Sequence, residues 1–134
     1  MPLMNSLTFV LRSHLKSKDY HFECGWGNGY VALPPGHLLW GINYDQLNNY
    51  IRVHGGLTYS NQFSEEWRNR IKELGNVPEE VTEEWWVIGF DTAHFRDNEY
   101  DQDEAYVRAE AKYLKEQIDG ITMGTINAPP SLEE

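Results

Sequence analysis

Polar side chains able to form a site follow three apolar segments of the chain. His37 comes after GYVALPPG, His54 comes after IRV, and the pair Asp91 and His94 comes after WWVIGF. Imidazoles and carboxylates act as general acids and bases, as metal ligands and as hydrogen-bond partners of bound molecules. If the parent segments are neighbouring strands, these side chains converge at the ends of one sheet, and this convergence is the hypothesis to test.

A metal site is one interpretation of that convergence. His54, Asp91 and His94, with His37 as a further ligand, would leave an open coordination position for water on zinc, manganese or iron. This arrangement predicts a metal-dependent hydrolase. The sequence contains neither HExxH nor CxxC, so the prediction depends on residue types alone.

Nucleophilic catalysis is a second interpretation. Cys24 with a histidine and an Asp or Asn could form a thiol triad, and the HGG sequence at residues 54–56 resembles the glycine loop that supplies oxyanion donors in esterases. No GxSxG motif occurs. Cys24 lies in an expected strand, where a lone cysteine usually serves as a small buried apolar residue.

A pocket that binds a small molecule without catalysis is the interpretation we favour. Aromatic rings stack on nucleobases, while glycine amides and an arginine such as Arg52 or Arg96 can hold a phosphate. Several aromatic residues flank the polar side chains, whereas Trp67, Trp85 and Trp86 are expected in the core. The predicted ligand-binding residues are Trp26, His37, Trp40, His54, Gly55, Gly56, Thr58, Asp91, His94 and Arg96. A structural or protein-interaction module, in which the polar residues only brace loops, remains a further alternative.

The order of motifs resembles a family of small uncharacterised proteins encoded by bacteriophages and prophages. The motifs are GNGYVALPPGH, YD, VHGGLTYS, WWVIGFDTAHFRDN and a helix like YVRAEAKYLKEQI, and they span most of residues 25–118. The most specific are HGGLT and GFDTAH, whereas the LLWG sequence after His37 departs from the family. The resemblance implies an accessory factor in a host bacterial cytoplasm, and one such class sequesters a host nucleotide immune signal as a counter-defence.

Composition limits the classes of protein to be considered. The 134 residues are 40% hydrophobic and 24% charged, which predicts one soluble domain over residues 1–134, with 1–4 and 121–134 extended or frayed. The apolar runs are too short for a membrane helix, and we expect a cytoplasmic protein without a signal peptide. A net charge of -10 disfavours general nucleic-acid binding. The sequence is compatible with a homo-oligomer as well as with a monomer.

The elements that must position these residues follow from periodicity and capping. Residues 5–18 fit a helix or a strand, residues 20–33 read as a hairpin reversing at GWGN, and a short helical turn is expected at 44–50. IRVHGGLTYS reads as strand, kink and strand. Ser64 is expected to begin a helix that Gly75 ends, and a longer helix runs from Asp103 to Asp119. EWWVIGFD is expected to be a central strand buried on both faces.

These elements do not alternate regularly between strand and helix. Four or five mostly antiparallel strands with two or three helices, including a long C-terminal helix, predict a compact α+β fold.

Overall fold

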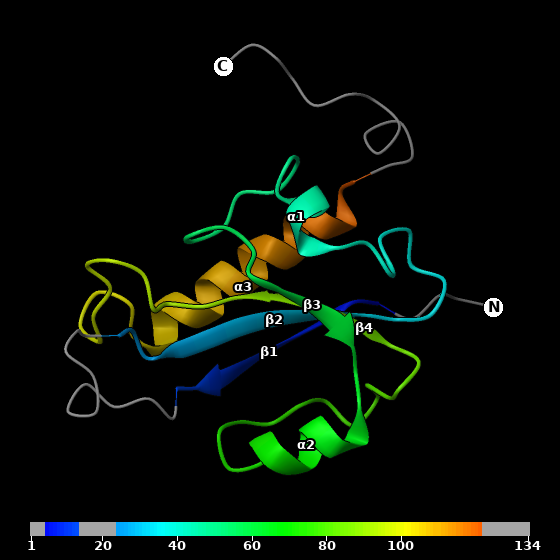
Figure 1. Ribbon diagram of the computed structural model, residues 1–134, viewed down its shortest axis with the longest axis horizontal. Coiled ribbons are helices and arrows are strands. Elements are labelled where there is room, and N and C mark those ends of the chain that lie inside the picture. Colours follow the sequence, from blue (N-terminus) through cyan, green and yellow to red (C-terminus); the bar gives the residue numbers. More distant parts are fainter. Residues whose placement is uncertain (1–4, 14–23, 122–134) are drawn as a thin grey trace.

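The computed structural model describes residues 5–13 and 24–121 and shows one β-sheet with helices packed against it (Figure 1). The strands are β1 (Leu7–Arg12), β2 (Gly27–Leu33), β3 (Tyr59–Gln62) and β4 (Trp86–Phe90). They form one sheet of order β1-β2-β4-β3 in which every neighbouring pair is antiparallel. The helices are α1 (Tyr44–Leu47), α2 (Glu65–Ile71) and α3 (Glu104–Asp119). The α+β prediction is confirmed.

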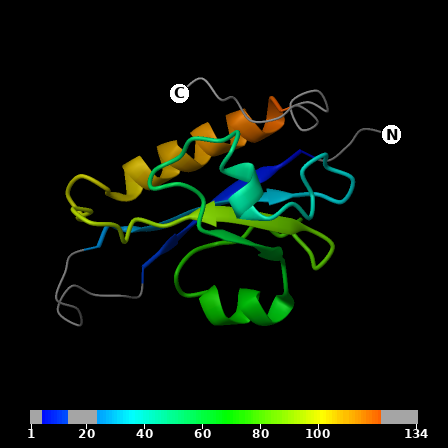
Figure 2. The same ribbon diagram turned by 45° about the horizontal axis from the view of Figure 1, so that its top comes forward.

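The sheet separates two hydrophobic cores, one on each face. Helices α1 and α3 cover one face and α2 lies on the other (Figure 2). Along β4, Ile88 and Phe90 belong to the core beneath α3, whereas Val87 belongs to the core on the α2 side. Successive side chains of a strand point to opposite faces, so β4 is buried on both, as its continuous apolar sequence predicts.

Both predicted helix starts are correct. The side chains of Ser64 and Asp103 accept hydrogen bonds from the backbone N–H groups of Trp67 and Tyr106, which satisfies donors that the first helical turn leaves free. Gly75, however, does not end α2, which stops at Ile71. Gly75 instead lets the chain pass close to the edge of β1, because a Cβ there would lie 2.3 Å from the carbonyl oxygen of Val10.

The expected hairpin at residues 20–33 is wrong over its described part. Gly27 and Asn28 lie inside β2 and pair with β1, so GWGN is not a reversal. Neither Gly27 nor Gly29 has a positive φ. A Cβ on Gly27 would lie 2.0 Å from the carbonyl oxygen of Leu11, so this glycine is needed for close approach of two strands rather than for a turn. Of the two interpretations of residues 5–18, the strand is correct for Leu7–Arg12.

The strand predicted at Ile51–Val53 is also wrong. Residues 51–58 form a turn and irregular backbone, and the regular strand begins at Tyr59. The backbone N–H groups of Arg52 and His54 donate to side chains of α3 rather than to a neighbouring strand. The segment is therefore a loop fastened to the helix.

Two further sequence expectations concern the ends of the chain and membranes. Residues 1–4, 14–23 and 122–134 lie outside the described residues, so the expected frayed ends and the predictions for residues 14–18 and 20–23 are not tested. Within residues 5–13 and 24–121, no helix is both long and apolar enough to cross a membrane.

Candidate functional site

The turn after β4 is held in place at its first residues. The hydroxyl of Thr92 donates to the carbonyl oxygen of Gly27 at 2.7 Å, and the carbonyl oxygen of Thr92 accepts from the N–H of Gly25 at 2.7 Å. A Cβ on Gly25 would lie 2.4 Å from Thr92, so glycine permits this contact. Burial of β4 and these two bonds place Asp91 and His94 at the end of the sheet.

Asp91 and His94 lie beside the HGG loop, as the sequence predicts. Nε2 of His94 is 2.9 Å from Oδ1 of Asp91. This nitrogen is enclosed and forms no directed hydrogen bond, so the two side chains are in close contact without a hydrogen bond between them. A Cβ on Gly55 would lie 2.2 Å from the same nitrogen, which shows that the imidazole packs directly on the glycine backbone. Thr58 joins the group by donating to Oδ2 of Asp91 at 3.3 Å.

His54 is the centre of a network that joins two loops to α3. Its Nε2 lies 2.9 and 3.0 Å from the carboxylate oxygens of Asp97, and its Nδ1 lies 2.7 Å from the hydroxyl oxygen of Tyr106. Its backbone N–H donates to Oε1 of Glu110 at 2.9 Å. The carboxylate of Asp97, which is 6% exposed, also accepts from the backbone N–H of His94.

The hydrogen-bond roles in this network follow from its chemistry. The His54 tautomer with its proton on Nε2 gives every group a partner, because Nε2–H then donates to Asp97 and Nδ1 accepts from the Tyr106 hydroxyl. Burial, followed by the nearby Glu110 and Asp97 charges, raises the pKa of Tyr106, so the phenol keeps its proton. Both ring nitrogens of His54 are engaged, and the network braces the loops.

The metal interpretation gains no support from this arrangement. No group of three His, Cys, Asp or Glu side chains in the described part of the chain is placed to hold a metal ion. The rings of His54 and His94 lie 5.7 Å apart between centroids, but both nitrogens of His54 already have partners. The metal prediction for His54, Asp91 and His94 therefore stays a prediction without geometric support.

His37 and Trp40 do not join the other predicted residues. Nε2 of His37 lies 3.6 Å from Asp119, thirteen residues beyond Tyr106 along α3, a rise of about 20 Å. Trp40 packs on Trp86 and donates through Nε1 to the carbonyl oxygen of Glu84. The convergence hypothesis is thus correct for two of its three polar groups, and it is wrong for His37 because the 34–42 loop leaves the sheet at the opposite end.

The remaining predicted residues occupy separate positions around the site. Gly56 has φ +82° and faces the side chain of Asn48, which secures the loop by accepting from the N–H of Leu57 and donating to its carbonyl oxygen. Trp26 packs against the core beneath α3. Arg96 is exposed with its guanidinium 5.4 Å from the ring centroid of Phe95.

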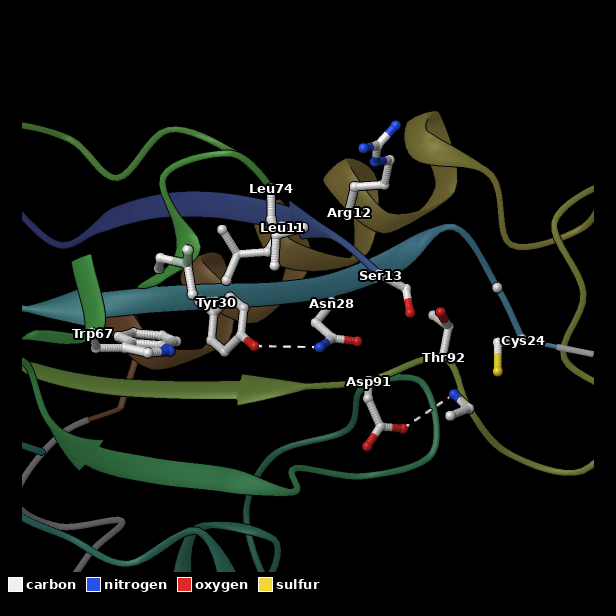
Figure 3. Close-up of a pocket in the computed structure, with 13 residues that line it drawn as sticks. Leu11, Arg12, Ser13, Cys24, Asn28, Tyr30, Trp67, Leu74, Asp91 and Thr92 are labelled. Carbon is white, nitrogen blue, oxygen red and sulfur yellow. Dashed lines mark hydrogen bonds between the residues drawn. The ribbon is translucent and has the colours of Figure 1, made fainter. Parts of the chain in front are cut away.

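A cavity of about 240 Å³ lies on the α2 face of the sheet, beside Asp91 (Figure 3). Tyr30 and Trp67 form its aromatic wall, with their rings 5.5 Å apart and nearly perpendicular. Asn28 and Asp91 belong to its polar part, and Nδ2 of Asn28 donates to the hydroxyl oxygen of Tyr30 at 3.3 Å. The other lining residues are Leu11, Arg12, Ser13, Cys24, Gly25, Ile71, Leu74, Thr92 and Ala93.

The ionisable groups that line the cavity are poorly suited to nucleophilic chemistry. Burial, followed by the nearby carboxylates of Asp91, Asp97 and Glu99, raises the pKa of the Cys24 thiol. The thiol is therefore protonated at neutral pH, whereas a nucleophilic cysteine needs a lowered pKa. Burial raises the pKa of Tyr30 to about 12. The raised pKa of Cys24 disfavours the thiol-triad interpretation.

Sequence reasoning missed several residues of the site. Asp97, Tyr106 and Glu110 complete the His54 network, yet they belong to segments that read as an acidic loop and as the polar face of a helix. Spacing on α3 was an available signal, because Tyr106 and Glu110 are four residues apart and share one helix face. The sequence pattern predicts a turn at Asn28 and a core position for Trp67, and no local signal places the two residues in one cavity.

Comparison of the chain with protein-family models, with curated proteins and with solved structures finds no match. The resemblance to phage-encoded proteins stays a prediction.

Proposed function

We propose that this protein is a non-catalytic binder of a small, nucleotide-like ligand, and that the cavity beside Asp91 takes the base ring. The observation that carries the proposal is the pairing of an aromatic wall, Tyr30 and Trp67, with polar groups of Asn28 and Asp91 around one hollow. Base stacking on aromatic side chains contributes about 1–3 kcal/mol per base. The polar groups of Asn28 and Asp91 can then form hydrogen bonds with the polar edge of the base and so discriminate between bases.

Cavity size favours a ligand with one ring system. Ligand sites commonly occupy about 300–1,000 Å³, so a cavity of about 240 Å³ suits a base or nucleoside better than a dinucleotide. The raised pKa values of Cys24 and Tyr30 disfavour a thiolate or phenolate nucleophile in the cavity, which favours binding without catalysis. The proposed site therefore keeps Asp91 from the sequence prediction and gains Asn28, Tyr30 and Trp67.

Phosphate recognition has less support than base recognition. Among the described residues that line the cavity, Arg12 carries the only positive charge, and its guanidinium points away from Tyr30 and Asn28 (Figure 3). Arg52 donates to backbone carbonyl oxygens of its own loop, and Arg96 stacks on Phe95. We therefore expect a nucleoside to bind about as well as its nucleotide.

The resemblance to phage proteins suggests a biological setting for such a site. A small cytoplasmic protein that holds a nucleotide-like molecule without consuming it would lower the free concentration of a host immune signal. The proposal of a binder and the proposal of a counter-defence role are separate, and the first can be correct without the second.

Ligand-dependent thermal stability tests the binding proposal. Purified protein is melted with adenosine, guanosine, cytidine, uridine and their linear and cyclic monophosphates, each at about 1 mM. A ligand at ten times its Kd stabilises the native state by about 1.4 kcal/mol, which is a Tm shift of a few degrees. Absence of a shift with every compound would overturn the proposal.

Two tryptophan variants make the test specific to the cavity. Trp67→Leu removes part of the aromatic wall and is expected to abolish the ligand-dependent shift. Trp40→Leu removes a partly buried indole at the opposite end of the sheet and is expected to retain it. Equal shifts in both variants would show that the ligand binds elsewhere.

A further inference from the structure

Two aromatic side chains project from the loop between β4 and α3. Phe95 is 90% exposed and Tyr100 is 89% exposed. Single exposed apolar residues are common on proteins, but two almost fully exposed aromatic rings five residues apart are not explained by folding. Five residues span at most about 18 Å, so both rings fit within one protein interface of standard size, about 800 Å² per partner.

Each ring is carried on a tight turn with a defined backbone. The N–H of Asp97 donates to the carbonyl oxygen of His94 at 2.9 Å and closes the turn that carries Phe95. The N–H of Gln102 donates to the carbonyl oxygen of Asn98 at 2.9 Å and closes the turn that carries Tyr100.

Side chains hold these turns and attach them to the rest of the fold. Oδ1 of Asn98 accepts from the N–H groups of Tyr100 and Asp101, and Oε1 of Gln102 accepts from the N–H of Asn98. Asp97 fastens the first turn to His54, and the carbonyl oxygen of Gln102 accepts from the N–H of Trp26. The loop is ordered before any partner binds, which reduces the entropy cost of association.

Charge around the two rings defines the kind of partner. Residues 95–103 include three exposed carboxylates, Glu99, Asp101 and Asp103, and one exposed cation, Arg96. The whole chain carries a net charge of -10. Exposed acidic residues in the same loop as two exposed apolar rings complement a basic surface with an apolar hollow.

We propose that the loop of residues 94–103 is a docking surface for a basic protein, with Phe95 and Tyr100 as its anchors. Rigid aromatic residues are the common hot spots of interfaces, and rim charges raise the rate of association. A second copy of this chain is disfavoured as the occupant, because like charges on both sides would repel. The proposal is independent of the cavity, since neither anchor lines it.

Selection from a displayed library of random peptides tests the surface with a defined probe. The full-length protein is immobilised, and bound peptides are sequenced and measured by titration. We expect enrichment of peptides that combine Lys or Arg with an aromatic or large aliphatic residue. We also expect their affinity to fall by at least tenfold for Phe95→Ser/Tyr100→Ser, and by severalfold when salt is raised from about 50 to 300 mM.

Matched variants distinguish peptide binding at this surface from non-specific binding to other parts of the protein. Tyr113→Ser removes a 47% exposed ring from α3 and should bind the selected peptides as the wild type does. Glu99→Gln/Asp101→Asn should lower the association rate and weaken the salt dependence. Far-ultraviolet circular dichroism confirms that each variant is folded.

Three results would overturn the proposal. The first is that no peptide is enriched, and the second is that enriched peptides bind the Phe95→Ser/Tyr100→Ser variant unchanged. The third is a concentration-dependent dimer in light scattering that this variant abolishes, because a second copy would then occupy the surface.

Discussion

Gly55 is the residue on which the position of His94 depends. Its φ is +68°, a backbone conformation that residues with a side chain rarely adopt. A Cβ at this position would lie 2.2 Å from Nε2 of His94. The motif HGG therefore acts through geometry: the first glycine provides both a left-handed backbone and room for an imidazole. Asp91 is in turn held close to that imidazole at the rim of the cavity.

Gly55→Ala is expected to lower the free energy of unfolding by about 2–4 kcal/mol. Left-handed backbone in a residue with a Cβ costs about 1–2 kcal/mol, and the clash with His94 adds to it. Urea denaturation measures the change.

Gly41→Ala supplies the matched control. Gly41 has φ +85°, but a Cβ there would meet no atom within 4 Å, so only the backbone cost applies. The difference between the two variants isolates the contact with His94. His94→Ala in the Gly55→Ala background should recover most of this difference, and equal destabilisation by the two single variants would contradict the close packing.

At the scale of elements, α3 connects parts of the chain that do not pair in the sheet. Glu110 and Gln117 accept hydrogen bonds from backbone N–H groups of the 51–58 loop. At its C-terminal end, Asp119 accepts from the hydroxyl of Ser6 at 2.8 Å and from Lys115, and it lies near His37. The helix thus aligns the start of β1, the HGG loop and the loop after β2.

Asp119 makes part of this connection dependent on pH. Burial opposes its ionisation, but hydrogen bonds from Lys115 and Ser6 outweigh burial and lower the pKa of the carboxyl group. A lowered native pKa stabilises the fold above the unfolded pKa, and this contribution is lost as the pH falls through the native value. The side chain is 39% exposed, so the effect is small.

Asp119→Asn is expected to lower the free energy of unfolding by about 0.5 kcal/mol at pH 7. This difference between the wild type and the variant, called the gap below, should close as the pH falls below about 4. Urea denaturation across this range measures both values. Glu116→Gln removes a carboxylate of the same helix that forms no ion pair among the described residues, and it should leave the gap near zero. A gap that widens in acid would contradict the assignment.

At the scale of the whole molecule, the two cores share β2 and β4. Tyr30 and Ala32 belong to the core on the α2 side, and Val31 and Leu33 belong to the core beneath α3. Loss of packing in one core therefore destabilises β2 and β4, whose other faces form part of the second core. We expect the sheet to couple both cores into one unfolding transition.

Ile71→Ala in α2 and Leu114→Ala in α3 test this coupling. Each side chain is buried, and each truncation is expected to cost about 2–5 kcal/mol. Tryptophan fluorescence and far-ultraviolet circular dichroism should report one shared midpoint in each variant. Lys112→Ala, at an exposed position of α3, should change little. Separate midpoints for the two probes would show that the cores unfold independently.

Local patterns were sufficient for several elements. The cap residues Ser64 and Asp103 mark the starts of α2 and α3, and the apolar run before Asp91 identifies the central strand. These signals depend on a few neighbouring residues and on burial. Glycines were less informative, because Gly27 and Gly29 serve close approach inside the sheet while the pattern resembles a turn.

Local sequence patterns are enough to predict the α+β class, the buried strand β4 and the placement of Asp91 and His94 at its end. The partners that these residues meet follow from the three-dimensional arrangement of the elements. His54 binds Asp97 and Tyr106, and the cavity wall combines Tyr30 with Trp67, although these residues are 37 to 52 positions apart. Short-range spacing specifies helices and strands through local backbone geometry. Long-range pairs depend on strand order and on the path of loops, which no local pattern encodes.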